Sequence, residues 1–171
     1  TGSIDVESRN GGAIVQSADS IFNSASGSIR LNAAGDIKVG DISTVGGTVS
    51  LVSGGAVLDA DATSNGVNDT LLNISGVSLR INAAAGVGAA GNALETAVAV
   101  LTVRAGGSIY LVERDGVVIG DVRPTVNRVQ IDSTTPVSAQ QTDATQSDLT
   151  TTATSNGNIV LISSDGPIQL R

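Results

Sequence analysis

The stretch "GSIRLNAAGDIKVGDI", residues 27–42, has a close counterpart in "GSIYLVERDGVVIGDV", residues 107–122. Both begin with Gly-Ser-Ile-x-Leu, continue into a second short apolar alternation, and end in Gly-Asp followed by Ile or Val. Strict alternation of apolar and other residues is typical of a β-strand with one buried face. The pair therefore predicts a repeated unit of strand, turn, strand and turn.

The first strand of this unit occurs six times along the chain. Each copy has a small or polar residue, an aliphatic residue, any residue and a second aliphatic residue, and the copies begin at Ser3, Ser28, Thr48, Ser78, Ser108 and Asn158. In four copies a second apolar stretch follows at one fixed distance, from Ile29 to Ile37, Val49 to Val57, Leu79 to Val87 and Ile109 to Val117. A third apolar stretch comes next. Because Ile109 and Ile29 start the same motif and have the same offset to the second stretch, we predict that they occupy equivalent positions in the fold.

Three short strands in each repeat, separated by Gly, Asn and Asp, predict the coil of a solenoid. We expect an all-β fold, a right-handed parallel β-helix of about seven coils with three short strands in each. An antiparallel β-sandwich is the alternative, because Asp115-Gly116 and Asp165-Gly166 fit hairpin turns. A sandwich does not explain why the corner at residues 35–42 returns at residues 115–122.

The composition restricts both the core and the chemistry. The 171 residues include one Phe, one Tyr and no Trp, Met, Cys or His. The core must therefore be made of Val, Ile, Leu and Ala, and the most common general base and the thiol nucleophile are missing. The net charge of −7 argues against nucleic acid as a partner. No apolar run approaches the roughly 20 residues of a membrane helix, so we expect no membrane insertion.

We expect residues 1–171 to form a single β-helix segment. The chain begins at Thr1, contains no Met and shows no signal peptide, so we interpret it as a processed chain or, preferably, as a segment of a longer chain. The Thr-rich residues 133–156 have no aliphatic alternation and are predicted to be a surface excursion, with one extra coil at 126–131 before it. The stretch "NALETAV", residues 92–98, predicts a single helical turn at a coil corner.

Residues 83–122, "AAAGVGAAGNALETAVAVLTVRAGGSIYLVERDGVVIGDV", resemble a recurrent unit of giant bacterial adhesins of the filamentous-haemagglutinin-like kind. The family unit has a Gly-Ile-Gly turn, an Ala-Leu-Glu-Thr segment, a Leu strand, a Gly-x-Ile-x-Leu strand and a Gly-rich strand. The corresponding residues here are Gly86-Val87-Gly88, Ala93-Leu94-Glu95-Thr96, Leu101, Gly107-Ser108-Ile109 and Val117-Val118-Ile119-Gly120. The looser strand repeat covers most of the chain. The resemblance implies a β-helix that builds a stalk, and it implies no particular ligand.

The residues that alternate outward from the predicted first strands are the candidates for catalytic or binding side chains. These positions are Asp5, Arg30, Ser50, Arg80, Tyr110 and Val160. They contain no carboxylate pair of the kind that polysaccharide-cleaving enzymes use, so no catalytic residue is predicted. Asp5 and Arg30 are expected to form a surface ion pair worth at most about 1 kcal/mol.

Three further patterns allow two interpretations each. "DADATSNGVND", residues 59–69, resembles a calcium loop in the spacing of Asp59 and Asp61, but Thr70 stands where an EF-hand needs Glu, which favours a polar turn. Asn68 and Asn73 begin glycosylation patterns that we interpret as incidental. Asn32 and Asn82 follow first strands and predict either a side-chain ladder or capped turns.

The sequence thus predicts a structural, non-enzymatic segment of an extracellular bacterial fibre or adhesin at the cell surface. Such a segment forms a stiff rod that stacks end to end with copies of itself or continues in a longer chain. A carbohydrate-binding module, with Tyr110 and residues 133–156 as candidate contacts for a cell-surface or polysaccharide ligand, is the first alternative. A polysaccharide-active enzyme is the second. No cofactor or metal is expected.

Overall fold

The computed structural model describes residues 2–61, 71–128, 139–154 and 157–171. Within these ranges the chain forms strands and turns and no helix. The strands in chain order are β1 (Ile4–Ser8), β2 (Ile14–Val15), β3 (Ile21–Ser24), β4 (Ile29–Ala33), β5 (Ile37–Val39), β6 (Asp41–Thr44), β7 (Thr48–Ser53), β8 (Val57–Asp59), β9 (Ile74–Ala83), β10 (Leu94–Ala105), β11 (Ile109–Glu113), β12 (Val117–Ile119), β13 (Thr125–Arg128), β14 (Ala139–Thr142), β15 (Leu149–Thr151), β16 (Ile159–Ser163) and β17 (Ile168–Leu170). Almost all of them pair in parallel.

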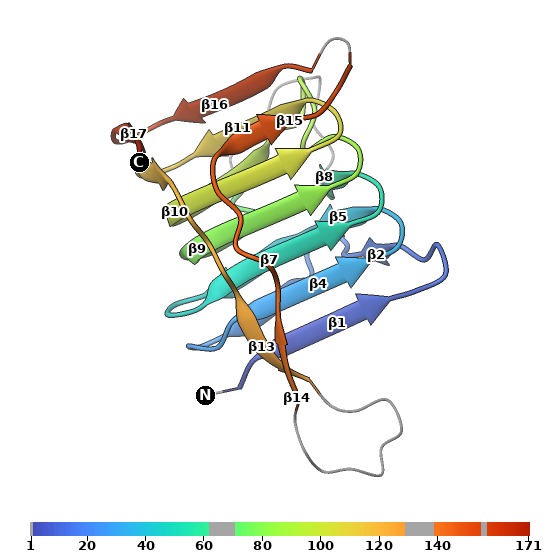
Figure 1. The fold of residues 1–171 in the computed structure, drawn as a ribbon. Helices are drawn as coiled ribbons and strands as arrows, with labels where there is room; N and C mark the ends of the chain where they lie inside the picture. Colours follow the sequence, from blue (N-terminus) through green and yellow to red (C-terminus); the bar gives the residue numbers. More distant parts are fainter. Residues whose placement is uncertain (1, 62–70, 129–138, 155–156) are drawn as a thin grey trace.

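One long sheet places the strands side by side in the order β1-β4-β7-β9-β10-β11-β16, all parallel (Figure 1). Its first five strands hold equivalent aliphatic residues in register, namely Ile4, Ile29, Val49, Leu79 and Leu101. Parallel neighbours are joined by crossover connections and not by hairpins, so every connection also supplies strands elsewhere in the fold. These parallel pairings exclude the antiparallel sandwich.

Two further ladders lie on those crossovers. In one, β2 pairs with β5 and β5 with β8, and single bridges then join Val57 to Val87 and Val87 to Ile109. In the other, β3 pairs with β6, β6 with the start of β9, and the start of β9 with the start of β10. Strands β9 and β10 are long because each runs from the third ladder directly into the first.

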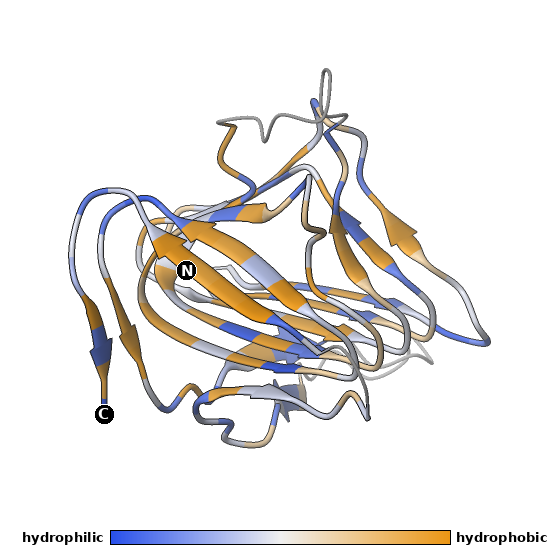
Figure 2. Cartoon of the chain, turned by 90° about the horizontal axis from the view of Figure 1, so that it is seen from above, coloured by the Kyte–Doolittle hydropathy of each residue, from blue (hydrophilic) through white to orange (hydrophobic). Residues whose placement is uncertain are grey.

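The core is a set of aliphatic columns that the ladders bring into register. Ile29, Leu31, Val49, Leu51 and their equivalents in β9 and β10 have no solvent exposure, whereas Ile4 and Val6 of β1 are partly buried. Figure 2 looks down on the stack and shows hydrophobic and hydrophilic residues alternating along the strands. Branched aliphatic residues that repeat at the same place in successive strands can fill such a core without aromatic rings.

The corners between strands are as tightly packed as the core. At Gly54 an added Cβ would stand 2.2 Å from the carbonyl oxygen of Ala34, and at Gly106 it would stand 1.9 Å from that of Ala84. Real Cβ atoms do not approach backbone so closely, so a side chain at either position would push neighbouring segments apart. The small residues that the sequence places after its first strands are therefore a steric requirement.

The structure corrects the predicted equivalence of Ile29 and Ile109. The residue in register with Leu79 is Leu101, and Ile109 instead bridges Val87 in the second ladder. Likewise Val117 is not the neighbour of Val87; its own partner is Ile168. The two quoted stretches look alike because both alternate, and alternation records which residues face inward but not which ladder they join.

The predicted helical turn at residues 92–98 is also wrong. Strand β10 begins at Leu94, and Thr96 lies in register with Ile74 of β9. Residues 94–98 all have ladder partners in the sheet, and tertiary pairing overrides a local helical preference. Asn32 and Asn82 do not form a ladder either, because Val52 lies between them in register.

A hairpin interrupts the regular path after β12. Strand β12 lies beside Val100 and Leu101 of β10, whereas β15 lies beside residues 103–105 of the same strand. Between them the chain leaves the sheet, forms the antiparallel pair β13–β14, and runs down across the sheet face towards β1 (Figure 1). We call residues 121–128 and 139–148 the crossing hairpin. Its antiparallel pairing replaces the extra coil predicted for 126–131, of which 129–131 lie outside the described residues.

Candidate functional site

The crossing hairpin covers a row of polar side chains on the outer face of the long sheet. Register places Asp5, Arg30, Ser50, Arg80 and Thr102 side by side on successive strands. Each of them stands between two aliphatic residues of its strand that belong to the core or pack against it. Arg30 and Arg80 are only 5% and 6% exposed, and Ser50 and Thr102 are completely buried.

Arg30 lies at the centre of this row and binds two carboxylates. Its Nε donates to Oδ1 of Asp143 at 2.9 Å, and its Nη1 donates to Oδ1 of Asp5 at 3.1 Å. The second oxygen of Asp143 accepts from Oγ of Ser50 at 2.7 Å. Every oxygen of Asp143 is thus bound by a group of the sheet, and the three charged side chains are at most 8% exposed.

A second arginine, Arg128 of the hairpin, extends the network to β1. Its Nε donates to Oδ2 of Asp5 at 2.7 Å, and its Nη2 lies 2.6 Å from Oε2 of Glu7. The hydrogen bond to Asp5 raises the pKa of Arg128. The pKa of Glu7 is lowered, first by its hydrogen bond from the exposed Arg9 and then by the charge of Arg128. The hairpin is therefore held at β1 by ion pairs with both of its acidic side chains.

Arg80 has fewer partners than Arg30. Its Nε donates to the backbone oxygen of Ala144 at 3.1 Å, and its buried Nη1 has no hydrogen-bond partner among the described residues. Burial lowers the pKa of Arg80, and the nearby charge of Asp143 opposes that effect. Arg30 and Arg80 together bring two buried positive charges to the two sides of Ser50, and Asp143 is the hairpin carboxylate placed between them.

Gln146 completes the contact between hairpin and sheet. Its Nε2 donates to the backbone oxygen of Ile81 at 2.8 Å and to Oγ1 of Thr102 at 3.3 Å. Thr102 in turn donates to the backbone oxygen of Asp148 at 2.9 Å. Gln146 also exchanges two backbone hydrogen bonds with Val122, which fixes the register of the hairpin. The sheet thus recognises three positions of the segment 143–146.

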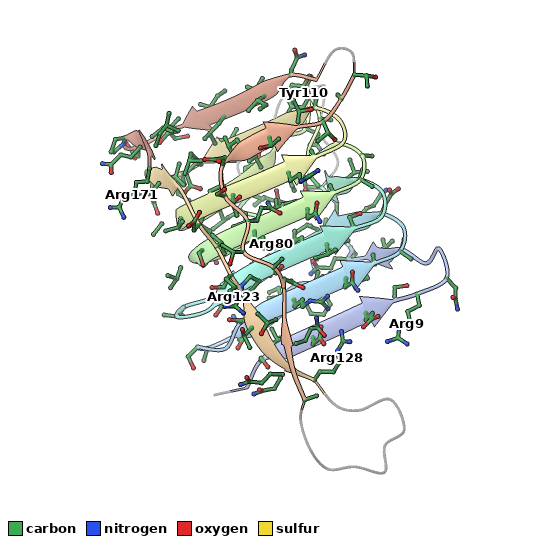
Figure 3. All side chains as sticks on the ribbon, viewed as in Figure 1. Arg9, Arg80, Tyr110, Arg123, Arg128 and Arg171 are labelled. Carbon is green, nitrogen blue, oxygen red and sulfur yellow. The ribbon has the colours of Figure 1, made fainter. Side chains whose placement is uncertain are left out.

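The predicted outward positions divide into two groups. Asp5, Arg30, Ser50 and Arg80 share one row, but the Asp5–Arg30 ion pair is buried and not at the surface as predicted. Tyr110 pairs in register with Val160 on β16 and lies at the other end of the stack from Arg9 and Arg128 (Figure 3). Its hydroxyl is 3.4 Å from Nδ2 of Asn158.

Sequence reasoning missed Thr102 and the role of Asp143. One signal could have revealed Thr102: after β1, the true first strands carry small residues four and five positions after their first aliphatic residue, as in Ala33-Ala34, Ser53-Gly54, Ala83-Ala84 and Ala105-Gly106. Ile109 is followed at those positions by Glu113 and Arg114 instead. No local pattern identifies Asp143, because its partner Arg30 is 113 residues away in the chain.

The predicted polar turn near Asp59 contains a buried hydrogen-bond network. Nδ2 of Asn73 donates to Oδ1 of Asp59 at 2.8 Å and to the backbone oxygen of Gly40, and Oδ1 of Asn73 accepts from the backbone N–H of Glu95 at 2.9 Å. Asn73 is completely buried, so in the folded chain it cannot carry a glycan. Thr63, Asn65, Asn68 and Thr70 lie outside the described residues.

Glu113 of β11 is a buried acid that lies outside the row. Its carboxylate accepts from Oγ1 of Thr96 at 2.5 Å and from the backbone N–H of Val98 at 3.0 Å, and it has no exposure. Burial raises its pKa, although these hydrogen bonds act in the opposite direction. In the part of the chain that the structure describes, no three His, Cys, Asp or Glu side chains are arranged to hold a metal ion.

The described residues also contain no helix long and apolar enough to cross a membrane. Comparisons of the chain with protein-family models, with curated proteins and with solved structures give no match of any of the three kinds.

Proposed function

We propose that the parallel strands form successive coils of a right-handed parallel β-helix. The support is the order of the three ladders: a strand of the first ladder is followed in the chain by one of the second and one of the third, before the chain returns to the first. In this arrangement β4, β5 and β6 make one coil, and β7, β8 and the start of β9 make the next. The register then advances by one strand spacing, about 4.8 Å, per coil.

We infer that the function of this β-helix is structural, as a segment of an extracellular bacterial fibre or adhesin. The observation that carries the proposal is the in-register aliphatic column Ile29, Val49, Leu79 and Leu101, which continues from coil to coil. Many backbone hydrogen bonds join each coil to the next, and they share any force that would stretch or bend the rod at that junction. A chain built in this way gains length in proportion to its number of coils.

The polar surface is consistent with this role. Charged residues make up 15% of the chain, and the net charge is −7. A surface rich in Ser, Thr, Asn and Gly remains hydrated, while the net charge limits lateral association of neighbouring rods. A fold without cysteine depends on its ladders and its core for stability in an oxidising environment. As part of the same proposal, we place the segment outside the cell, at the bacterial surface.

The direct test is the mass of the native polypeptide under denaturing conditions, detected in its source with an antibody against this chain. A mass many times the 16.9 kDa of the present chain is expected, because a fibre needs many more coils. Stretching of that polypeptide by atomic force microscopy is expected to show repeated small unfolding steps. A native mass close to 16.9 kDa, or cleavage of bacterial or host polysaccharides by the purified protein, would contradict the proposal.

A further inference from the structure

The sheet face under the crossing hairpin holds the segment 143–146 by groups that do not depend on the hairpin being part of the same chain. Arg30 and Ser50 bind the carboxylate of Asp143, Arg80 binds the carbonyl of Ala144, and Ile81 and Thr102 bind the amide of Gln146. The contacts of the sheet are therefore with one acidic side chain, one backbone carbonyl and one amide of an extended segment. This is the set of contacts by which a binding face recognises a short peptide.

The sheet face under the hairpin carries buried positive charge, which favours an anionic ligand. Arg30 and Arg80 are both more than nine-tenths buried, and a buried guanidinium is costly unless it is paired. Within the part of the chain that the structure describes, Arg80 retains an Nη1 without a hydrogen-bond partner, so the face offers more donor capacity than Asp143 uses. Charge-assisted bonds from a guanidinium and a hydroxyl to both oxygens of one carboxylate are short and directional.

We propose that Arg30, Ser50 and Arg80 form a binding site for an acidic peptide in extended conformation, and that residues 143–146 of this chain fill the site in the resting state. The crossing hairpin is then a ligand held in cis. Because the hairpin is tethered, its effective concentration at the site is high, and a free peptide competes only when the cis contacts are weakened. The site is independent of the fibre function, since it needs only the face of β4, β7 and β9.

The test begins with the carboxylate alone. The variant Asp143→Ala removes the carboxylate and leaves space between Arg30 and Ser50. The variant Asp143→Asn removes the same negative charge but keeps that space filled. Sodium acetate is expected to raise the thermal midpoint of Asp143→Ala in a saturable manner relative to sodium chloride of equal ionic strength. The wild type and Asp143→Asn are expected to show no such difference. An equal response of both variants, or none in either, would overturn the proposed carboxylate site.

The second step tests the peptide. In the double variant Asp143→Ala with Gln146→Ala, the cis segment loses its two side-chain contacts. A labelled synthetic peptide of residues 141–147, QTDATQS, is expected to bind this variant at least about tenfold more tightly than the same peptide carrying Asp143→Asn, measured by fluorescence anisotropy. The wild type is expected to bind neither. Equal affinities for the two peptides, or acetate binding as tightly as the acidic peptide, would overturn the peptide as ligand class.

A third variant covers the case in which the double variant does not fold. Gln146→Ala alone keeps the carboxylate of Asp143 in place and removes only the amide contacts to Ile81 and Thr102. The acidic peptide is then expected to bind this variant more tightly than it binds the wild type, because the cis segment is held by fewer bonds. Binding no tighter than to the wild type would overturn the proposal.

Discussion

Strands β4, β7 and β9 bury side chains on both of their faces, but the inner face is aliphatic and the outer face is charged and polar. On the inner face Leu31, Leu51 and Ile81 stack in register and need only similar neighbours above and below. On the outer face Arg30 and Arg80 are nearly as buried, but what covers them is the crossing hairpin. The inner face can therefore be extended by repetition, whereas the outer face requires one specific partner.

The difference also separates what each face contributes. Aliphatic burial stabilises in proportion to area and tolerates exchange of one aliphatic residue for another. A buried ion row contributes little net stability, because desolvation offsets attraction, but loss of one member leaves a charge without its partner. We expect the inner face to determine how stable the stack is, and the outer face to determine where the hairpin binds.

The largest expected effect is that of Arg30→Ala. This change leaves Asp143 with only Ser50 as a partner on the sheet, and leaves one oxygen of Asp5 unpaired, in a buried environment. We expect a loss of about 3–5 kcal/mol in the free energy of unfolding, measured by urea denaturation. Arg30→Met combined with Asp143→Leu is the matched control, because it removes both charges and fills the space. If the double variant is no more stable than Arg30→Ala, the ion row stabilises the fold in its own right.

A slightly smaller effect is expected from Leu51→Ala on the inner face. Leu51 has no exposure and contacts the core between Leu31 and Ile81. The change is expected to cost about 2–4 kcal/mol through lost burial and the cavity that remains. Val45→Ala, at a residue that is 85% exposed, is the control and should leave stability nearly unchanged. A loss below that of Val45→Ala would show that the columns are not the stabilising feature.

The contrast between the faces also explains how much the sequence could predict. The alternation in residues 27–42 and 47–58 predicts the strands and their inward residues, because each strand depends on its own short stretch of sequence. Ile37, Val57 and Val87 indeed join one ladder as their spacing predicts. The assignment of Ile109 is wrong because the unit after Leu79 lacks the Ser-Ile start, so its first strand at Leu101 was not recognised.

The outer face could not be predicted in the same way. The sequence predicts every residue of the row except Thr102, but as exposed positions, since nothing in the local pattern of Arg30 or Ser50 indicates a cover. The cover comes from a segment rich in Thr and Gln, whose side chains have no apolar periodicity. Contacts over more than 100 residues, such as Arg128 with Asp5, depend on the path of the hairpin and leave no local pattern.

A third prediction uses the buried acid Glu113, which belongs to neither face. Because burial raises its pKa in the folded state, the folded chain holds this proton more tightly than the unfolded chain does. The stability contributed by the protonated Glu113 carboxyl is therefore fully present below the pKa of the unfolded chain, about 4.5, and is lost as the pH rises through the folded pKa. Glu113→Gln keeps an acceptor for Val98 and cannot ionise.

We expect the free energy of unfolding of Glu113→Gln, relative to the wild type, to increase from pH 4 to pH 8 in urea titrations. Glu113→Ala is the control, because it cannot ionise either but leaves the buried N–H of Val98 without its acceptor; it should remain about 1–3 kcal/mol less stable than Glu113→Gln at every pH. A difference between Glu113→Gln and the wild type that is constant with pH would show that Glu113 ionises equally easily in the folded and unfolded chains.

The smallest effect is expected where an ion pair of the same network reaches solvent. Arg9 donates to Oε1 of Glu7 at 2.7 Å, but its side chain is 55% exposed, in contrast to 7% for Arg30. Arg9→Ala should therefore cost no more than about 0.5 kcal/mol, and the difference should vanish in 1 M NaCl, where exposed charges are screened. Arg30→Ala should retain most of its effect in the same salt, because its partners are shielded from water. If salt reduced both losses alike, the hairpin would not be excluding solvent from the row, and the outer face would behave as an ordinary charged surface.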